Sequence, residues 1–332
     1  MKFLIIRFSS IGDIVLTTPV VRCLKEQVSD AEVHFLTKRV FAPVLEANPY
    51  IDKLVLLNDS WELMMHQLQS EKYDYVIDLH RNLRTWRVKR GLPGAQKFSF
   101  HKLNASKWLL TALKINLLPP VHIVDRYLNT VRSLGVVNDE RGLDYFIPVR
   151  DQVKQQDLPA SHWFGYIGVV IGAAHNTKKL PVHRLQELCR HLNYPVVLLG
   201  GKEDEAAGSE VASIDPIRIY NACGRFSLNE SADLVRKAKL IISHDTGLMH
   251  IAAAFGRPVL SAWGNTVPAF GMWPYYGSTK PAPLNEVFEV KGLWCRPCSK
   301  IGYDRCPLKH FKCMEQQDVL RMAQVAMEAV IR

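Results

Sequence analysis

The sequence predicts an α/β protein with two domains, each built around a parallel sheet, and three observations support this fold class. Short apolar runs typical of buried strands alternate with amphipathic, helix-like stretches along most of the 332 residues. The alternation restarts after a polar stretch near the middle of the chain. The length also suffices for two domains with separate cores. We therefore expect two parallel sheets wound by right-handed crossovers.

Residues 1–150 are expected to form the N-terminal domain, which begins with the apolar run Phe3–Ile6. The runs Lys53–Leu57 and Tyr73–Leu79 are short and have turn residues nearby, as buried strands do. We expect strands near residues 2–8, 32–37, 53–57 and 73–79, and helices near residues 14–28, 40–47, 59–70 and 124–134.

Residues 151–163 are polar with few apolar anchors and are interpreted as a linker to a second domain, residues 164–314. We expect strands of this domain near residues 167–172, 195–200, 217–220, 239–243 and 258–262. Residues 315–332 form a C-terminal helical pattern with Val319 and Ala323 on one side. The simplest interpretation is that this last helix caps the second domain.

Composition indicates a globular protein, and no stretch approaches the roughly 18 apolar residues that a membrane-spanning helix needs. The chain starts at once as a strand that carries Lys2 and Arg7, which is not the layout of a signal peptide. We therefore expect a cytoplasmic, soluble protein.

The segment Ser243–Ala254 follows a strand-like run and opens a helix. Asp245 and Thr246 stand where a helix N-cap belongs, and Gly247 lets the backbone approach a ligand closely. Free N–H groups and the positive end of the helix dipole suit an anion such as a diphosphate. An ordinary capped helix is the alternative interpretation.

A second motif, Phe8–Ile14, follows the first strand and precedes a helix-like run. The first strand–helix turn of an open α/β sheet is where ligands are usually held. The dinucleotide fingerprint G-x-G-x-x-G is absent, but the turn places the carboxylate of Asp13 at the end of the strand. Alternatively, Asp13 only caps the following helix.

Together, SSIGD at residues 9–13 and SHDTGLMHIAAAFGRP at residues 243–258 resemble glycosyltransferase family 9, the heptosyltransferases of lipopolysaccharide inner-core synthesis. The resemblance implies a GT-B fold, in which a cleft separates two Rossmann-like domains. It implies inverting transfer of a heptose from an ADP-sugar to Kdo-lipid A or heptosyl-Kdo-lipid A. In GT-B enzymes a terminal helix often packs back across the first domain, which gives the last helix an alternative position.

Glycosyl transfer needs a base for the acceptor hydroxyl, and Asp13 is our candidate. The leaving diphosphate needs preorganised donors, for which we expect Lys178, the N–H groups of Thr246 and Gly247, and His250, beside Asp245. His250 is equally interpretable as a core histidine. Direct attack by the acceptor predicts inversion of the anomeric carbon.

Residues 172–181 contain paired lysines before Pro181, and the resemblance assigns the donor phosphates to Lys178, with Lys179 left as an alternative. It also places an acid against the nucleoside ribose, for which Glu203 is the better match and Asp204 the second. Exposed surface residues are the alternative interpretation in both cases. The family commonly carries Gly-Pro-Thr-Asp-Pro where this chain has Gly-Asn-Thr-Val-Pro, so Val267 leaves the donor sugar open.

Nine Lys or Arg residues and no acid lie between Arg81 and Lys114, interleaved with Trp and Phe. This segment favours an anionic lipid or an acidic substrate, although a solvated basic surface is the usual alternative. A phosphorylated lipid-linked saccharide at the inner face of the inner membrane is the expected acceptor. We expect its contacts at Ser10, Gly12, His80, Arg81 and Arg84.

Four of the seven cysteines, Cys295, Cys298, Cys306 and Cys313, lie in one short segment. Their spacing indicates either a structural zinc site or reduced, unliganded thiols. Asp-x-Asp is absent, so we expect no catalytic divalent ion and no other cofactor.

Two other functions are considered. A GT-B-shaped nucleotide-sugar epimerase would share the fold, but it has no anionic lipid for the basic segment to hold. A nucleic-acid-binding protein would fit the net charge of +10, but it leaves both strand–helix motifs unexplained. We therefore expect no nucleic-acid partner.

Overall fold

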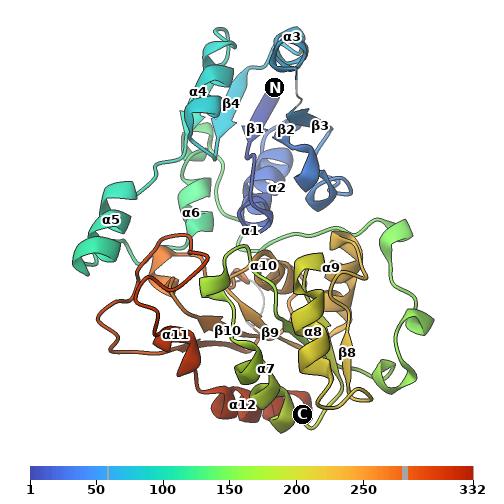
Figure 1. The fold of residues 1–332 in the computed structure, drawn as a ribbon. Coiled ribbons are helices and arrows are strands. Elements are labelled where there is room, and N and C mark those ends of the chain that lie inside the picture. The colour runs from blue at the N-terminus through green and yellow to red at the C-terminus, as the bar shows by residue number, and fades with distance from the viewer. Residues whose placement is uncertain (58–59, 279–282, 332) are drawn as a thin grey trace. The chain divides into compact units, whose positions relative to one another are not determined.

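The computed structural model describes residues 1–57, 60–278 and 283–331, and it contains two sheets in which every strand pair is parallel (Figure 1). The first sheet has the strand order β3-β2-β1-β4-β5, and the second has the order β11-β10-β9-β6-β7-β8. Each is the order of a doubly wound sheet, in which the chain starts in the middle and winds outward in two directions. The α/β fold class with two parallel sheets is confirmed.

Contacts divide the chain into two units, described here one at a time. The first comprises Met1–Lys102, Val121–Pro148 and a short segment that begins at Gly277. The second comprises Leu103–Pro120, Val149–Tyr276 and the C-terminal part of the chain. Residues 103–120, inside the range expected for the first domain, thus group with the second unit. The expected cleft between the domains stays a prediction.

The first unit contains the five strands of the first sheet and the helices that follow them. Its elements are β1 (Lys2–Ile6), α1 (Ile11–Val15), α2 (Thr18–Gln27), β2 (Glu32–Lys38), η1 (Arg39–Val44), β3 (Lys53–Leu57), α3 (Trp61–Ser70), β4 (Tyr75–Asp78), α4 (Leu83–Arg90), β5 (Gln96–Ser99), α6 (Ile123–Leu128) and η2 (Arg132–Leu134). Alternate residues of β1 and β4, among them Leu4, Ile6 and Val76, join one buried core cluster.

The helices of the first unit are shorter than the sequence predicts. The helix expected at 14–28 is two helices, because Pro19 has no N–H and suits only the first turn of a helix, here that of α2. Residues 39–44 form a 3₁₀ helix that contains Pro43. The helix expected from residue 59 begins at Trp61, and residue 59 lies outside the described residues.

The second unit contains the six strands of the second sheet. Its elements are α5 (Asn104–Leu113), η3 (Val149–Asp151), η4 (Gln155–Asp157), η5 (Ala160–His162), β6 (Ile167–Val170), η6 (Asn176–Lys178), α7 (Val182–His191), β7 (Val196–Leu199), η7 (Lys202–Asp204), α8 (Glu205–Ala212), β8 (Ile219–Asn221), α9 (Leu228–Lys237), β9 (Leu240–His244), α10 (Gly247–Ala254), β10 (Val259–Trp263), η8 (Pro268–Phe270), β11 (Asn285–Glu289), α11 (Lys312–Glu315) and α12 (Val319–Ile331).

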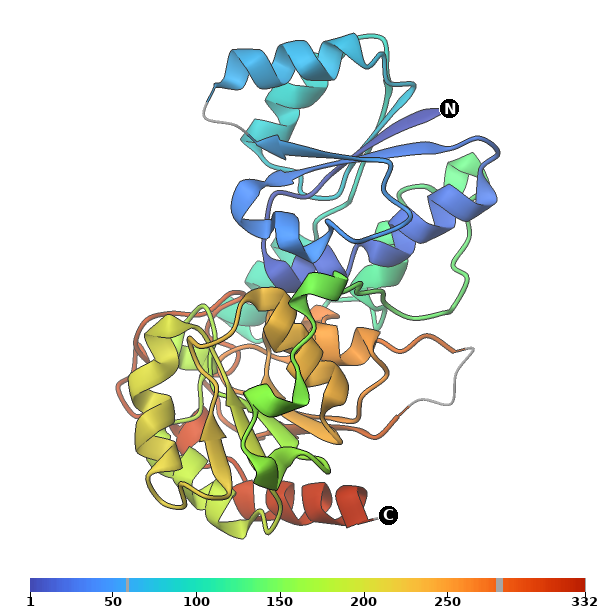
Figure 2. The ribbon, with the colours of Figure 1, turned by 90° about the vertical axis from the view of Figure 1, so that its right-hand side faces the viewer.

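The segment predicted as a linker has three short 3₁₀ turns and runs along the second unit, of which it is part (Figure 2, green). The Val153 N–H donates to Asp233 Oδ2 at 2.9 Å, and Lys237 donates to the Val153 carbonyl. Both partners are on α9, so the segment is anchored to this unit by hydrogen bonds.

The last helix packs on the second unit. Val319, Met322 and Ala326 of α12 are buried in the same core cluster as Leu185 and Leu188 of α7, which lies beside it (Figure 1). Its interpretation as a helix that caps the second domain is therefore confirmed. Among the described helices, none combines the length and apolarity that crossing a bilayer requires.

Candidate functional site

Both motifs singled out in the sequence lie where a doubly wound sheet binds ligands. Strand order reverses between β1 and β4 in the first sheet and between β6 and β9 in the second. The loops that follow the two strands at such a reversal run to opposite faces of the sheet and leave a crevice. The turn with Asp13 follows β1, and the turn with Asp245 follows β9.

Asp13 is held at both carboxylate oxygens. Its Oδ1 lies 2.6 Å from the Arg7 guanidinium, and its Oδ2 accepts hydrogen bonds from Ser10 Oγ at 2.8 Å and the Ser10 N–H at 3.3 Å. The side chain is 23% exposed, so solvent and ligands reach it. Asp13 thus caps α1, as the simpler interpretation expects, and it still presents an accessible carboxylate.

Arg7 was missed as a site residue by the sequence analysis. It is 8% exposed and donates from Nη1 to the Leu79 carbonyl at 2.6 Å and to Tyr127 Oη at 3.1 Å. Its Nε donates to the Ser9 carbonyl at 2.8 Å. One guanidinium therefore joins the turn after β1 to the turn after β4 and fixes its last nitrogen on Asp13. The sequence feature that could have pointed to Arg7 is its position directly after a buried strand.

The expected acceptor residues lie in these same two turns. Gly12 is buried in the first turn of α1. The Asp78 carboxylate at the end of β4 accepts the N–H groups of His80 at 3.1 Å and Arg81 at 2.6 Å. Arg81 takes a left-handed backbone conformation and donates to the Phe100 carbonyl, and Arg84 is exposed on α4.

His80 is a neutral side chain at physiological pH. Burial, together with the nearby Arg7 and Lys102 cations, lowers its pKa to about 4 against the opposing charges of Asp13 and Asp78. Its ring packs against Phe8 with the ring centres 5.2 Å apart. A neutral imidazole here can exchange hydrogen bonds with a hydroxyl.

In the second unit, Lys178 and Asp245 meet at the reversal between β6 and β9. Lys178 Nζ lies 2.6 Å from Asp245 Oδ2 and donates to the Asp245 carbonyl at 3.2 Å. Thr266 Oγ1, after β10, donates to the same Oδ2 at 2.9 Å. Three turns thus converge on one carboxylate, with the ammonium at the crevice.

Lys179 is engaged elsewhere. Its Nζ lies 2.7 Å from Asp204 Oδ1, whose other oxygen accepts the Gly201 N–H at 3.0 Å. Asp204 is buried, whereas Glu203 is exposed on the same turn. The two lysines are thus paired with different carboxylates, and Glu203 is the exposed acid of the second turn.

Helix α10 begins at Gly247 with Thr246 as its N-cap, and the Thr246 side chain makes no capping bond to its own helix. His250 is buried one turn further along, which fits its interpretation as a core histidine. The neighbouring His244 accepts the Leu180 N–H on Nε2 at 2.9 Å, and burial lowers its pKa to about 4. His244 therefore ties the lysine turn to β9 as a neutral ring.

Asn265 stands where the family commonly has a proline, and it was not predicted as a site residue. It is 1% exposed, and within the described part of the chain neither atom of its amide has a hydrogen-bond partner. A buried amide without partners is costly, so a ligand or water that reaches it would be held. Val267 is half-buried and follows Thr266 into the 3₁₀ helix η8.

The four clustered cysteines are free thiols around the segment between β11 and α11. Burial, with smaller contributions from the charges of the other three cysteines, raises the pKa of Cys313 to about 12. Cys295 Sγ lies 3.9 Å from His310 Nε2. No three of these sulfur atoms lie within 4.8 Å of one another, although all belong to the described residues.

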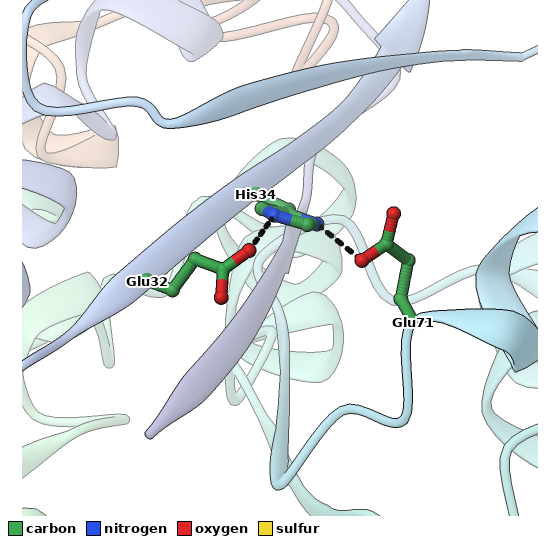
Figure 3. A group of neighbouring side chains, drawn as sticks. All are labelled: Glu32, His34 and Glu71. Carbon is green, nitrogen blue, oxygen red and sulfur yellow. Dashed lines mark hydrogen bonds and ion pairs between the residues drawn. The ribbon is translucent and has the colours of Figure 1, made fainter.

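Among the described residues, one group has metal-ligand spacing: Glu32, His34 and Glu71 (Figure 3). His34 lies between the two carboxylates, with Nε2 2.8 Å from Glu32 Oε1 and Nδ1 4.0 Å from Glu71 Oε2. Lys2 Nζ lies 2.8 Å from Glu71 and 3.1 Å from Glu32, and Lys53 pairs with Glu71. The ammonium groups already balance the carboxylates, so this group is a structural ion network.

The fold and the two turns define a class: two-domain α/β proteins with ligand-binding groups at the switch points of both sheets. Comparison with known protein families identifies the particular family within this class. Residues 61–302 match glycosyltransferase family 9 (heptosyltransferase). The chain belongs to this family and is a glycosyltransferase.

Known relatives extend over most of the chain. Lipopolysaccharide heptosyltransferase 1 of Campylobacter coli is 25% identical over 348 residues, 98% of each chain. Lipooligosaccharide heptosyltransferase 2 of Haemophilus influenzae is 25% identical over 303 residues, 81% of this chain and 85% of that protein.

Solved structures share the fold. The ADP-heptose lipopolysaccharide heptosyltransferase II of Escherichia coli superposes with a TM-score of 0.69 at 20% identity, covering 99% of this chain and 100% of that one. Heptosyltransferase WaaC of E. coli with ADP gives a TM-score of 0.68 at 19% identity, with the same coverage. The GT-B fold predicted from the sequence is therefore confirmed.

Proposed function

We propose that this glycosyltransferase moves a heptose from ADP-heptose to a saccharide of the lipopolysaccharide inner core, with inversion at the anomeric carbon. The observation that carries the proposal is that each sheet has charged groups at its switch point: an accessible carboxylate in the first sheet and a lysine–aspartate pair in the second. Membership of a heptosyltransferase family and the names of the relatives supply the sugar and the acceptor.

Asp13 is the general base in this proposal. Its carboxylate accepts the proton of the acceptor hydroxyl as the oxygen attacks the anomeric carbon. Arg7 acts as a positioning residue, because its guanidinium contacts Oδ1 and favours the charged form of the carboxylate. Ser10 holds Oδ2 from the other side.

Lys178 and the start of α10 receive the leaving nucleoside diphosphate. Negative charge grows on the phosphate as the glycosidic bond breaks, and a fixed ammonium stabilises it. In the structure Lys178 is paired with Asp245, so binding the diphosphate means that Lys178 shares its charge between the two anions. Thr246, Gly247 and the dipole of α10 favour the same charge.

Recognition of the two substrates falls to side chains around these centres. Exposed Glu203 suits the two ribose hydroxyls, while Asn265 offers an unpaired amide to the donor. Arg81 and Arg84 suit acidic groups of the acceptor, with His80 and Gly12 nearby. Because the acceptor is lipid-linked, the reaction takes place at the inner face of the inner membrane, with the enzyme as a peripheral protein.

A structural zinc ion at the four cysteines also stays a prediction. The thiols would have to turn toward one another, because sulfur ligands around one zinc lie closer together than those of the structure. Elemental analysis of the purified protein tests it: zinc near one equivalent supports the site, and its absence with seven titratable thiols contradicts it.

Thermal stability with ADP, UDP, GDP and CDP tests the donor. A nucleotide at about 100 times its dissociation constant adds roughly 2.7 kcal/mol and raises the melting temperature by a few degrees. We expect the shift with ADP, followed by transfer from ADP-heptose to a Kdo-lipid A acceptor. A shift with UDP or GDP alone would contradict the donor, and no shift with any of them would contradict nucleotide-sugar transfer.

A further inference from the structure

Helix α5 of the second unit is apolar and exposed. Its sequence includes Trp108, Leu109, Leu110 and Leu113, yet Leu110 is its one buried residue in the described chain. Trp108 is 60% exposed. A helix of a globular protein normally turns its apolar face to the core. In α5, Trp108 and Leu113 instead stay exposed.

The apolar stretch continues beyond the helix and meets a second segment. Ile115 and Leu117 are exposed after α5. Lys114 Nζ donates to the carbonyls of Pro297 at 2.8 Å and Cys295 at 3.3 Å, which fixes the end of α5 to residues 290–311 (Figure 1). Both segments belong to the second unit.

Residues 290–311 are described throughout and have neither helix nor strand. They expose three further apolar side chains, Trp294, Ile301 and Leu308, of which Trp294 is 74% exposed. We call these three and the exposed residues of the first segment the apolar–basic surface; its apolar members are Trp108, Leu113, Ile115, Leu117, Trp294, Ile301 and Leu308. Exposed apolar side chains gathered on adjoining segments are typical of interaction sites.

The charge of this surface is almost entirely positive. Residues 103–120 and 290–312 contain one acid, Asp304, and eight basic residues. The Arg296 side chain is largely buried and paired with Glu289, and the other seven are Lys107, Lys114, Lys291, Lys300, Arg305, Lys309 and Lys312. Exposed Trp and Leu beside Lys and Arg are typical of segments that lie in the interface of an anionic bilayer.

We propose that the apolar–basic surface docks the enzyme on an anionic lipid bilayer, an inference that rests on the proposed lipid-linked acceptor. The Trp rings sit at headgroup level, the Leu and Ile side chains enter the acyl boundary, and the lysines pair with phosphates. A second copy of this surface is a poor partner, since it would bring like charges together. Nucleic acid offers nothing for the aliphatic side chains.

The test is sedimentation of the full-length protein with vesicles of phosphatidylcholine alone or mixed with phosphatidylglycerol. We expect the protein to bind the mixed vesicles. The double variant Trp108→Ser, Trp294→Ser should bind them about tenfold or more weakly. Lys300→Gln and Lys309→Gln should each weaken binding to the mixed vesicles by about fivefold. This loss should be smaller at high salt, because salt screens the attraction between lysines and lipid phosphates. The matched control is Phe164→Ser, because Phe164 is 90% exposed in the same unit but outside the surface.

Two outcomes would overturn the proposal. One is unchanged vesicle binding in the double variant, and the other is a dimer in light scattering that the double variant converts to monomer while vesicle binding persists. Measuring transfer to a deacylated, water-soluble acceptor distinguishes failure of the docking proposal from failure of the proposed function. If the double variant keeps that transfer and loses vesicle binding, docking is supported. If the unaltered enzyme transfers to no acceptor, the proposed function fails whatever the vesicles show.

Discussion

The two ends of the first sheet carry similar charged groups, but lysines enclose the carboxylates at one end while a carboxylate stays accessible at the other. At the amino ends of its strands, Glu32, His34 and Glu71 are closed in by Lys2 and Lys53 (Figure 3). At the carboxyl ends, Arg7 and Asp13 also form an ion pair, but on a turn at the switch point where the carboxylate stays accessible. The difference teaches that metal-ligand spacing alone does not make a site, whereas position at the switch point leaves a charge available.

The second unit repeats the difference within two adjacent residues. Lys179 and buried Asp204 form a pair that ties two turns together. Lys178 pairs with Asp245 at the switch point between β6 and β9. The two neighbouring lysines thus pair with carboxylates in different turns.

The largest effect should come from the carboxyl end of the first sheet. Asp13→Asn keeps the shape but removes the base, so we expect a loss in kcat of about 10²- to 10⁴-fold with nucleotide affinity unchanged. Arg7→Met should lower kcat less and shift the pH–rate profile, because Asp13 loses its cationic neighbour. Glu71→Gln, at the amino end, is the matched carboxylate and should leave kcat unchanged. Full activity of Asp13→Asn would remove Asp13 as the base.

A smaller effect should separate the two lysines. Lys178→Ala removes a charge from the diphosphate and should weaken ADP binding by about tenfold in calorimetry. Lys179→Ala leaves Asp204 buried without its cation, so it should lower the melting temperature while ADP affinity stays near normal. The reverse pattern would reassign the phosphate contact to Lys179.

The smallest effect concerns acid stability. Hydrogen bonds from Lys2 and then Lys53 lower the pKa of Glu71 from 4.5 to about 2. A carboxylate whose pKa is depressed by folding stabilises the protein above its unfolded pKa and loses that contribution as the pH falls from about 4.5 toward 2. Glu71→Gln should therefore cost about 1 kcal/mol or less near neutral pH, by urea denaturation. The cost should fade across that acid range; an equal cost at every pH would contradict the ion network.

The sequence predicts the site where chemistry follows directly from a strand end. Asp13, Lys178 and Asp245 each follow the end of a buried strand by eight residues or fewer, so strand order places them near the crevices. Arg7 directly follows a strand as well, but its role could not be predicted, because it depends on Leu79 and on Tyr127, 120 residues away. Such partners become visible only in three dimensions.

Strands were predictable where they carry an apolar run, as the edge strand β3 does. The edge strands β5 and β11 were missed, because segments such as Gln96–Ser99 expose polar side chains and lack such a run. The membership of α5 was missed for a related reason: its apolar residues suggested no particular partner, and its anchors, Lys114 to Pro297, are distant in sequence.

The excursion of residues 103–120 into the second unit has a consequence for how the protein can be made. The chain leaves the first unit after Lys102 and returns at Val121, so neither unit is one continuous length of polypeptide. A gene cut near residue 150 would give a first fragment carrying Leu110 without its packing partners and a second fragment missing α5. On the ribosome, α5 must wait for residues 290–311 to be synthesised before Lys114 finds its acceptors. Both halves are therefore completed only when the last part of the chain emerges.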